Sequence, residues 1–317
     1  MDRDARVWIA GPDTLVGAAL RRVLARQGFV HVGGAAPEPP LTDAAAVDAF
    51  VRRERPAYVF VAGGKSGGIR ANQEAPAELM LDNLLVAAHV MASAHRHGVR
   101  KLLYLASSCS YPKASPQPMP VESLMTGPLE PTSEAYAVAK LAGLTLCRAF
   151  QRQHGARFVG ALPGDVYGPG DDFGAETAHV APALIRRMHE AKVAGVPTVT
   201  VWGSGTPRRE LIFADDLADA CLVAARRWEG PEPINLGSGE EVTIAELAGT
   251  IRDVVGYRGE LRFDTSRPDG APRKRLDSSQ LFALGWRPTT ALSAGLAETY
   301  TWFRSSIAAV DTAVVAS

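Results

Sequence analysis

The stretch "LASSCSYPK" at residues 105–113 places a thiol where the apolar run of a predicted strand ends. Cys109 follows Ser107 and Ser108 and stands among small and polar residues. A structural cysteine usually lies inside a core. The position of Cys109 therefore raises the question of a chemical role, with a small packed residue as the alternative.

A second constellation lies in "YAVAK", where Tyr136 and Lys140 are four residues apart. That spacing puts both side chains on one face of a helix. A phenol there can donate a proton, while the ammonium lowers the phenol pKa and binds a ribose hydroxyl. In isolation a surface Tyr–Lys pair would be the favoured interpretation. Ser107, at the end of a predicted strand, decides against that reading, because ligands bind at strand ends of open parallel sheets.

A glycine-rich turn, "GPDTLVG" at residues 11–17, follows the first predicted strand and opens a helix. In dinucleotide-binding folds such a turn lets the backbone approach a pyrophosphate, which the helix N-terminus stabilises. Thr14 stands where a glycine is usual. The turn predicts a nucleotide cofactor bound by Gly11, Thr14, Leu15, Val16 and Gly17.

These residues need a parallel sheet to position them, and the first 170 residues alternate strand and helix patterns accordingly. Strands are expected at 6–11, 57–63, 101–108 and 157–170, with helices at 15–28, 78–98 and 136–155. This alternation implies right-handed crossovers and a doubly wound α/β sheet of the Rossmann type.

The pattern loosens after residue 170. Helices are expected at 181–191, 214–228, 243–256 and 298–306, strands at 198–203, 232–239 and 260–264, and a frayed end over 308–317. We therefore expect a dinucleotide-binding domain over 1–170. Residues 171–317 form a smaller α/β substrate-binding part, some of whose elements return to the main sheet.

Composition excludes several classes of protein. The chain has 317 residues, 46% of them hydrophobic, and its 34 basic and 34 acidic residues give no net charge. Nothing favours a nucleic-acid or membrane partner, and neither a signal peptide nor a membrane-spanning run is recognised. The three cysteines, Cys109, Cys147 and Cys221, match neither a disulfide framework nor a metal site. A reducing, cytoplasmic setting fits best.

The combination of Ser107 with Tyr136, Lys140 and an N-terminal glycine turn resembles the extended short-chain dehydrogenase/reductases that modify nucleotide sugars. The segments "SSCSYPK", "VYGPGDDF", "HVAPALIRRMHEAK", "VWGSGTPRRE" and "PDGAPRKRLD" resemble the GDP-L-fucose synthases in particular. Members of that family convert GDP-4-keto-6-deoxy-D-mannose by 3,5-epimerisation and 4-reduction. The resemblance covers nearly the whole chain at close to constant spacing.

The resemblance implies roles for the reactive residues. The C4 carbonyl makes the C3 and C5 protons acidic, and inversion needs one group to remove a proton and another to deliver one to the opposite face. Cys109 matches the base and His179 the acid. Ser107 and Tyr136 would hydrogen-bond the C4 oxygen, and Tyr136 would supply the proton when C4 is reduced.

The resemblance also implies binding residues and a homodimer. Arg187 matches a diphosphate contact, for which the guanidinium fork is suited. The further matches are Ser108, Asp165, Trp202, Arg209 and Asp269 for the nucleotide sugar, and Asp43, Pro163, Val166 and His179 for the cofactor, beside Tyr136 and Lys140.

Three departures from the family pattern stand out. Thr14 adds a side chain where backbone is expected to approach phosphate, and Asp165 replaces the usual Asn, so it cannot donate the hydrogen bond an amide can. The third is the absence of Lys and Arg from residues 27–51, where NADP-using relatives carry arginines for the 2′-phosphate. Glu38 or Asp43 could instead accept a hydrogen bond from a free ribose hydroxyl. The cofactor is therefore NADP(H) or NAD(H), and the missing arginines favour NAD(H).

Two alternatives remain at this stage. The same reactive residues would serve a GDP-hexose epimerase of the GDP-mannose type, acting at C5 or at C3 and C5, that retains NAD and performs no net redox reaction. A binding protein that kept the fold as a nucleotide sensor is the other, and the intact Ser107, Tyr136 and Lys140 weigh against it.

Overall fold

The computed structural model describes residues 1–174, 177–267 and 269–315. Its centre is a five-stranded parallel sheet of β1 (Val7–Ala10), β2 (Tyr58–Val61), β3 (Lys101–Leu105), β4 (Phe158–Pro163) and β9 (Ile234–Leu236), hydrogen-bonded in that order. The strands are almost wholly buried, as expected where helices cover both faces of a sheet. The predicted Rossmann-type α/β fold is confirmed.

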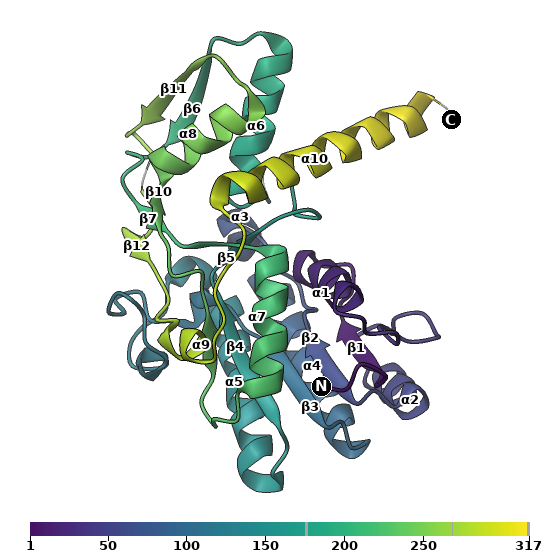
Figure 1. The fold of residues 1–317 in the computed structure, drawn as a ribbon. Coiled ribbons are helices and arrows are strands. Elements are labelled where there is room, and N and C mark those ends of the chain that lie inside the picture. The colour runs from purple at the N-terminus through teal and green to yellow at the C-terminus, as the bar shows by residue number, and fades with distance from the viewer. Residues whose placement is uncertain (175–176, 268, 316–317) are drawn as a thin grey trace.

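Helices cover both faces of this sheet (Figure 1). One face carries α1 (Leu15–Arg26) and α7 (Ala214–Arg227), which pack against each other. The other carries α2 (Ala44–Glu54), α4 (Pro76–Arg96) and α5 (Glu134–His154). Among the described residues, α4 alone is long and apolar enough to cross a membrane. It packs between α2 and α5 as a core helix of the sheet domain.

The strand that should follow α1 is reduced to one bridge. Val32 pairs with Val7, and Gly33 donates from its backbone N–H to the Val7 carbonyl at 2.8 Å. The sequence beyond it, "GGAAPEPP", explains why pairing stops, because Gly weakens a strand and Pro lacks the N–H that a ladder needs. Helix α2 begins soon afterwards, and the sequence pattern did not predict it.

A second group of elements packs around its own core. Strand β6 (Thr198–Trp202) pairs in parallel with β11 (Glu260–Asp264), and helices α6 (Val180–Ala194), α8 (Ile244–Val255) and α10 (Leu292–Val315) pack beside them. Figure 1 shows α10 projecting away from the rest of the molecule. The expectation of a helix over 298–306 with a frayed end was too short, because α10 extends from Leu292 to Val315; residues 316 and 317 lie outside the described residues.

Short strands join the two groups. The chain leaves the main sheet at Gly164, so the single strand expected over 157–170 is two: β4 and then β5 (Asp165–Tyr167), which pairs with β8 (Leu211–Phe213). Strand β7 (Arg208–Arg209) pairs with β10 (Val242–Thr243) and β12 (Arg273–Lys274). Two smaller helices are α3 (Ile69–Glu74) and α9 (Ser279–Ala283). Helix α7 and strand β9 lie with the main sheet although they follow residue 170.

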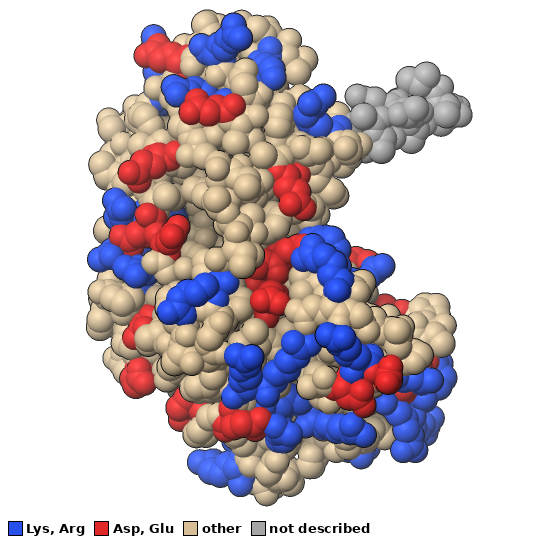
Figure 2. Space-filling view, viewed as in Figure 1, with Lys and Arg blue, Asp and Glu red and all other residues tan. Residues whose placement is uncertain are grey.

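Charged side chains of both signs are mixed across the face seen in Figure 2. This agrees with a chain of equal acidic and basic content, and the face shows no single-sign field over its whole extent.

Candidate active site

The carboxyl ends of β1 to β4 meet at one edge of the sheet, and the reactive residues gather there. Ser107 follows β3 and begins a single 3₁₀ turn, Ser108–Ser110. Its Oγ accepts a hydrogen bond from the Cys109 backbone N–H at 3.2 Å. This bond fixes the turn that carries the thiol, which is partly exposed, whereas Cys147 and Cys221 are buried.

Helix α5 brings Tyr136 and Lys140 to the same place. The Tyr136 hydroxyl hydrogen-bonds Ser107, and burial together with the nearby Cys109 raises the pKa of the phenol. The expected lowering of this pKa by Lys140 was wrong for the structure as it stands. The Lys140 ammonium donates to the Leu105 carbonyl at 3.2 Å and lies 5.7 Å from the centroid of the Tyr136 ring. The ammonium therefore does not offset the rise in the Tyr136 pKa that burial of the hydroxyl causes.

Burial also acts on Lys140 itself. The side chain is 6% exposed, and desolvation lowers its pKa to about 8, with the Asp82 carboxylate opposing the shift. At pH 7 the ammonium form still predominates. The pair therefore presents a protonated phenol, able to donate, beside a buried cation.

Lys274 belongs to this cluster, and sequence reasoning missed it. Its ammonium lies 3.6 Å from Cys109 Sγ and 3.7 Å from Asp165 Oδ1. Burial alone would lower the Lys274 pKa, but Cys109 and Asp165 raise it above its ordinary value. Asp165, which stands where the family pattern has Asn, thus faces a lysine ammonium that balances its negative charge. In the sequence, Lys274 stands out only as part of the segment "PDGAPRKRLD", which resembles the family pattern. No spacing rule connects it with Cys109 and Asp165, which are far away in the chain.

Glu210 holds these residues in register. The Asp165 N–H donates to the Glu210 carbonyl at 3.1 Å, and the Glu210 N–H donates to the Lys274 carbonyl at 3.3 Å. The buried Glu210 carboxylate accepts from the N–H groups of Leu276 and Gly239, each at 2.7 Å. Burial raises its pKa to about 7 despite these two bonds. One residue therefore ties three separate segments together behind Lys274.

His179 stands at the start of helix α6. It is the exposed N-cap residue of α6, and its carbonyl accepts from Ala183 at 3.0 Å. Within the described ranges no hydrogen bond joins its side chain to Cys109 or Tyr136. The structure brings Ser107, Cys109, Tyr136 and Lys140 together. Among the described residues, His179 makes no hydrogen bond or ion pair with them.

The glycine turn fits a dinucleotide. Gly11 has φ of +92°, and a Cβ there would lie 2.5 Å from the Gly63 Cα. A Cβ on Gly17 would lie 2.0 Å from the Gly11 carbonyl oxygen, so only glycine lets α1 start this close to β1. Thr14 is the N-cap residue: its Oγ1 accepts from the Gly17 N–H at 3.0 Å and donates to the Gly11 carbonyl at 2.9 Å. The threonine side chain therefore turns inward to cap the helix. Leu15 and Val16 present the first helical N–H groups, which suit a phosphate.

Two acidic residues near this turn behave differently. Glu38 accepts from the Gly11 N–H at 3.1 Å and from the Trp8 indole at 3.0 Å. Asp43 is the N-cap residue of α2, and its Oδ1 accepts from Ala45 and Ala46 at 2.9 and 3.0 Å. Glu38 is thus the carboxylate that hydrogen-bonds the Gly11 N–H of the glycine turn, while Asp43 caps helix α2.

The residues expected to hold the nucleotide sugar gather around the end of β6. The Arg187 guanidinium donates to the Thr200 carbonyl, and burial lowers its pKa. Trp202 is 64% exposed, with the Arg267 guanidinium 5.3 Å from its ring centroid. Asp269 accepts from the Ser204 N–H at 2.8 Å.

Arg209 joins this group through the strand beside it. It donates to the Ala271 carbonyl at 2.7 Å, which fixes the loop carrying Asp269. Pro268 of the same motif lies outside the described residues. Of the remaining expected residues, Ser108 is buried in the turn beside Cys109, Pro163 ends β4 and Val166 lies in β5.

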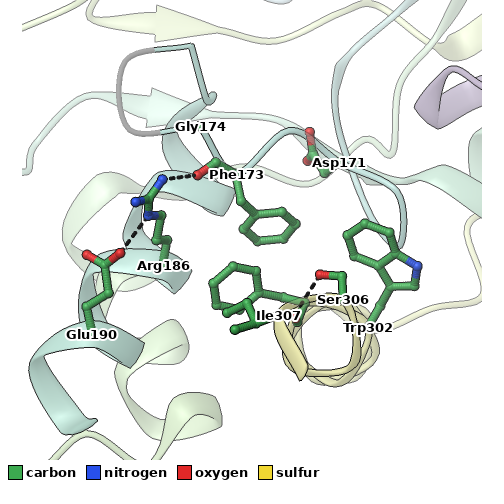
Figure 3. A pocket seen from close by; sticks show the side chains of 9 residues that line it. Asp171, Phe173, Gly174, Arg186, Glu190, Trp302, Ser306 and Ile307 are labelled. Atoms are coloured by element: carbon green, nitrogen blue, oxygen red, sulfur yellow. Dashed lines mark hydrogen bonds and ion pairs between the residues drawn. The ribbon is translucent and has the colours of Figure 1, made fainter. Parts of the chain in front are cut away.

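A cavity lies elsewhere in the molecule. It has a volume of about 500 Å³ and lies between the loop after β5, helix α6 and helix α10 (Figure 3). Phe173 and Trp302 line it, together with Arg186, which donates to Glu190 and to the Phe173 carbonyl. None of the reactive residues lines it. Within the described parts of the chain, no group of three or more His, Cys, Asp or Glu residues is placed to hold a metal ion.

Comparison with known proteins defines the class. Residues 7–237 match the family described as "NAD dependent epimerase/dehydratase family", and the chain belongs to it. GDP-L-fucose synthase 1 of Arabidopsis thaliana is 48% identical over 96% of this chain and 95% of its own length. GDP-L-fucose synthase of Escherichia coli is 46% identical over 94% of this chain and 96% of its own length. Within the epimerase/dehydratase class, the chain therefore belongs with the GDP-L-fucose synthases.

Solved structures agree with this assignment. A GDP-L-fucose synthetase from Naegleria fowleri bound to NADP superimposes with a TM-score of 0.89 at 27% identity, over 97% of this chain and 95% of the other. A GDP-6-OMe-4-keto-L-xylo-heptose reductase from C. jejuni gives the same TM-score at 29% identity, over 96% of this chain and 99% of the other.

Proposed function

We propose that this protein is a GDP-sugar epimerase/reductase that converts GDP-4-keto-6-deoxy-D-mannose to GDP-L-fucose or a close GDP-6-deoxyhexose. The observation that carries the proposal is the meeting of Cys109 with Ser107, Tyr136 and Lys140 at the carboxyl edge of the sheet. A carbonyl-binding pair and a potential carbon base share one small site. The names of the relatives support the same substrate class.

In this proposal Ser107 and Tyr136 hydrogen-bond the C4 oxygen of the sugar, where negative charge develops. The Cys109 thiolate removes a proton at C3 or C5 and becomes a thiol, and His179 returns a proton to the opposite face. When bound, the nicotinamide cofactor supplies the hydride that reduces C4. The raised pKa of Tyr136 keeps its hydroxyl protonated, so it can give its proton to the C4 oxygen at that moment.

The non-redox GDP-hexose epimerase is the weaker candidate. Its reactive residues would be the same, so the site geometry does not separate the two. The relatives do, because the GDP-L-fucose synthases match nearly the whole chain at up to 48% identity. A nucleotide sensor would not need a partly exposed thiol beside Tyr136.

Turnover of GDP-4-keto-6-deoxy-D-mannose in D₂O with NADH or NADPH tests the proposal. Absorbance follows the cofactor, and mass spectrometry follows deuterium at C3 and C5. Stoichiometric cofactor oxidation with deuterium incorporation is the expected result, and Cys109→Ser should abolish the incorporation. Deuterium uptake without cofactor consumption would favour the non-redox epimerase. Absence of both deuterium uptake and cofactor oxidation would overturn the proposal.

We further infer that the protein prefers NAD(H). Glu38 sits against the Gly11 N–H, and residues 27–51 contain no Lys or Arg. A carboxylate there suits a ribose 2′-hydroxyl and repels a 2′-phosphate. The N. fowleri protein, by contrast, was solved with NADP.

A pair of variants tests the cofactor preference. The ratio of kcat/KM with NADH to that with NADPH should exceed one in the wild type and fall about tenfold in Glu38→Ala. Asp43→Ala is the matched control: it removes a helix cap at a cost of about 1 kcal/mol and should leave the ratio unchanged. A ratio below one in the wild type, or a change only in the Asp43 variant, would refute the preference.

We also propose a homodimer formed through α4 and α5, the paired outer helices of the main sheet. Leu81 on α4 and Val138 on α5 are large apolar side chains that are 59% and 37% exposed, and a dimer through these helices would cover them. Light scattering should give twice the chain mass, and Leu81→Glu with Val138→Glu should give one chain mass.

Three free cysteines support a reducing, cytoplasmic compartment.

A further inference from the structure

Among the described residues, Lys274 is the one basic group in contact with Cys109, the proposed carbon base. Its ammonium lies 3.6 Å from Cys109 Sγ, and its side chain is 24% exposed. A partly desolvated ammonium at that distance attracts a thiolate much more strongly than it attracts a thiol. The contact is therefore selective for the form of Cys109 that removes a proton.

We propose that Lys274, held by Asp165, stabilises the thiolate of Cys109 and so prepares it to take the proton from the sugar carbon. The role of Cys109 as a carbon base rests on the proposed function. The pairing of Lys274 with Cys109 does not depend on it. When the thiolate takes the proton, its charge is lost and a thiol forms. The ammonium keeps its own proton throughout, so no oxidant or further reactant is needed.

Asp165 completes the arrangement. It lies 3.7 Å from Lys274, and the Cys109 and Asp165 charges together keep the lysine protonated against the effect of burial. Other charged groups also act on the cluster: Arg209 opposes protonation of Lys274, and the charge of Cys109 contributes to the raised pKa of Tyr136. Asp165 thus supplies a second anion beside a lysine whose side chain is only 24% exposed.

The position of Lys274 is built into the strands. In β12, Lys274 lies opposite Arg209 of β7, and Glu210 anchors the next residues by accepting from the Leu276 N–H at 2.7 Å. Met119 adds a second anchor, since its N–H donates to the Arg275 carbonyl at 2.7 Å. These backbone contacts fix the strand position from which the Lys274 side chain reaches the sulfur.

Alkylation of Cys109 by iodoacetamide tests the pair without any sugar or cofactor. Cys147 and Cys221 are 1% and 0% exposed, so peptide mass spectrometry can follow Cys109 alone in the folded protein. Lys274→Met should slow the reaction at pH 7 about fivefold to tenfold, because the thiolate loses its counter-ion. Lys274→Arg should restore most of the rate.

Arg273→Met is the matched control. Arg273 stands on the same strand but pairs with Glu241 at 2.7 Å, away from the thiol, so its loss should leave the alkylation rate unchanged. Circular dichroism on each variant shows that it is folded. Equal rates in folded wild type and Lys274→Met, or an equal loss in Arg273→Met, would overturn the inference.

Deuterium exchange into the nucleotide sugar separates the inference from the proposed function. If alkylation depends on Lys274 but the wild type exchanges no deuterium, the Lys274–Cys109 pair stands and the assignment of the reaction fails. If the wild type exchanges deuterium while alkylation ignores Lys274, the reaction stands and the inference fails.

Discussion

The two sides of the candidate site are built in different ways. On the main-sheet side, β3 is buried along its whole length and Lys140 on α5 is 6% exposed. On the other side, Trp202 is 64% exposed and Asp269 is exposed, and the neighbouring Arg209 lies on a strand of two residues. Tyr136 and Lys140 thus stand on a regular helix, and Ser107 follows a buried strand, whereas the expected nucleotide contacts at Trp202, Arg209 and Asp269 stand on short strands and loops.

The difference agrees with what each side is proposed to do. Proton transfer demands fixed geometry, since small displacements of a reacting group cost large factors in rate. Recognition of a nucleotide spreads over many contacts, each of modest energy. Changes on the main-sheet side should therefore lower kcat, and changes on the other side should raise KM.

The largest effect is expected for Tyr136→Phe. Removing the hydroxyl leaves the C4 oxygen without its proton donor, and kcat should fall about 10²- to 10⁴-fold. The variant should remain folded, because the ring keeps its place beside Lys140. Steady-state kinetics with the 4-keto sugar provides the measurement, with thermal unfolding as the control. A fall in kcat smaller than tenfold would mean that Tyr136 is not the donor.

The sequence predicted the main-sheet side better than the other. Regular patterns of apolar residues placed β1 to β4 and the helices α1, α4 and α5, although they missed α2 and α3. Ser107, Tyr136 and Lys140 followed from helix spacing and a strand end. Lys274 was out of reach, because its position depends on hydrogen bonds at Glu210 between segments distant in the chain. The pKa of Tyr136 was also mistaken, since the i,i+4 spacing says nothing about how deeply the hydroxyl is desolvated.

Asp171, in the loop between β5 and α6, should show an intermediate effect. The side chain is 8% exposed, and within the described residues its Oδ2 has no hydrogen-bond partner. Burial raises its pKa from 3.8 to about 7. Because the folded pKa exceeds the unfolded one, the folded state binds the proton more tightly, and stability falls as pH rises from about 4 to about 7.

Asp171→Asn removes this titration. The variant should be about 1–2 kcal/mol more stable than the wild type at pH 8, after the cost of burying an unpaired amide. At pH 4, where Asp171 is protonated, the variant should hold no such advantage. Urea unfolding at both pH values measures the difference. Equal stabilities at pH 8 would show that the loop accommodates the ionised carboxylate. Glu210, whose pKa is also raised to about 7, remains in both proteins and cancels in the comparison.

The smallest effect is expected for Trp202→Ala, on the exposed side. The Arg267 guanidinium lies over one face of the indole, and the largely exposed ring offers its surface to a base or sugar. Losing one aromatic contact costs about 1 kcal/mol, so KM for the nucleotide sugar should rise about fivefold with kcat nearly unchanged. Trp202→Phe should recover much of that loss. If kcat falls instead and KM stays constant, Trp202 orders the reacting groups, and the division between a rigid chemical side and a tolerant binding side would be wrong.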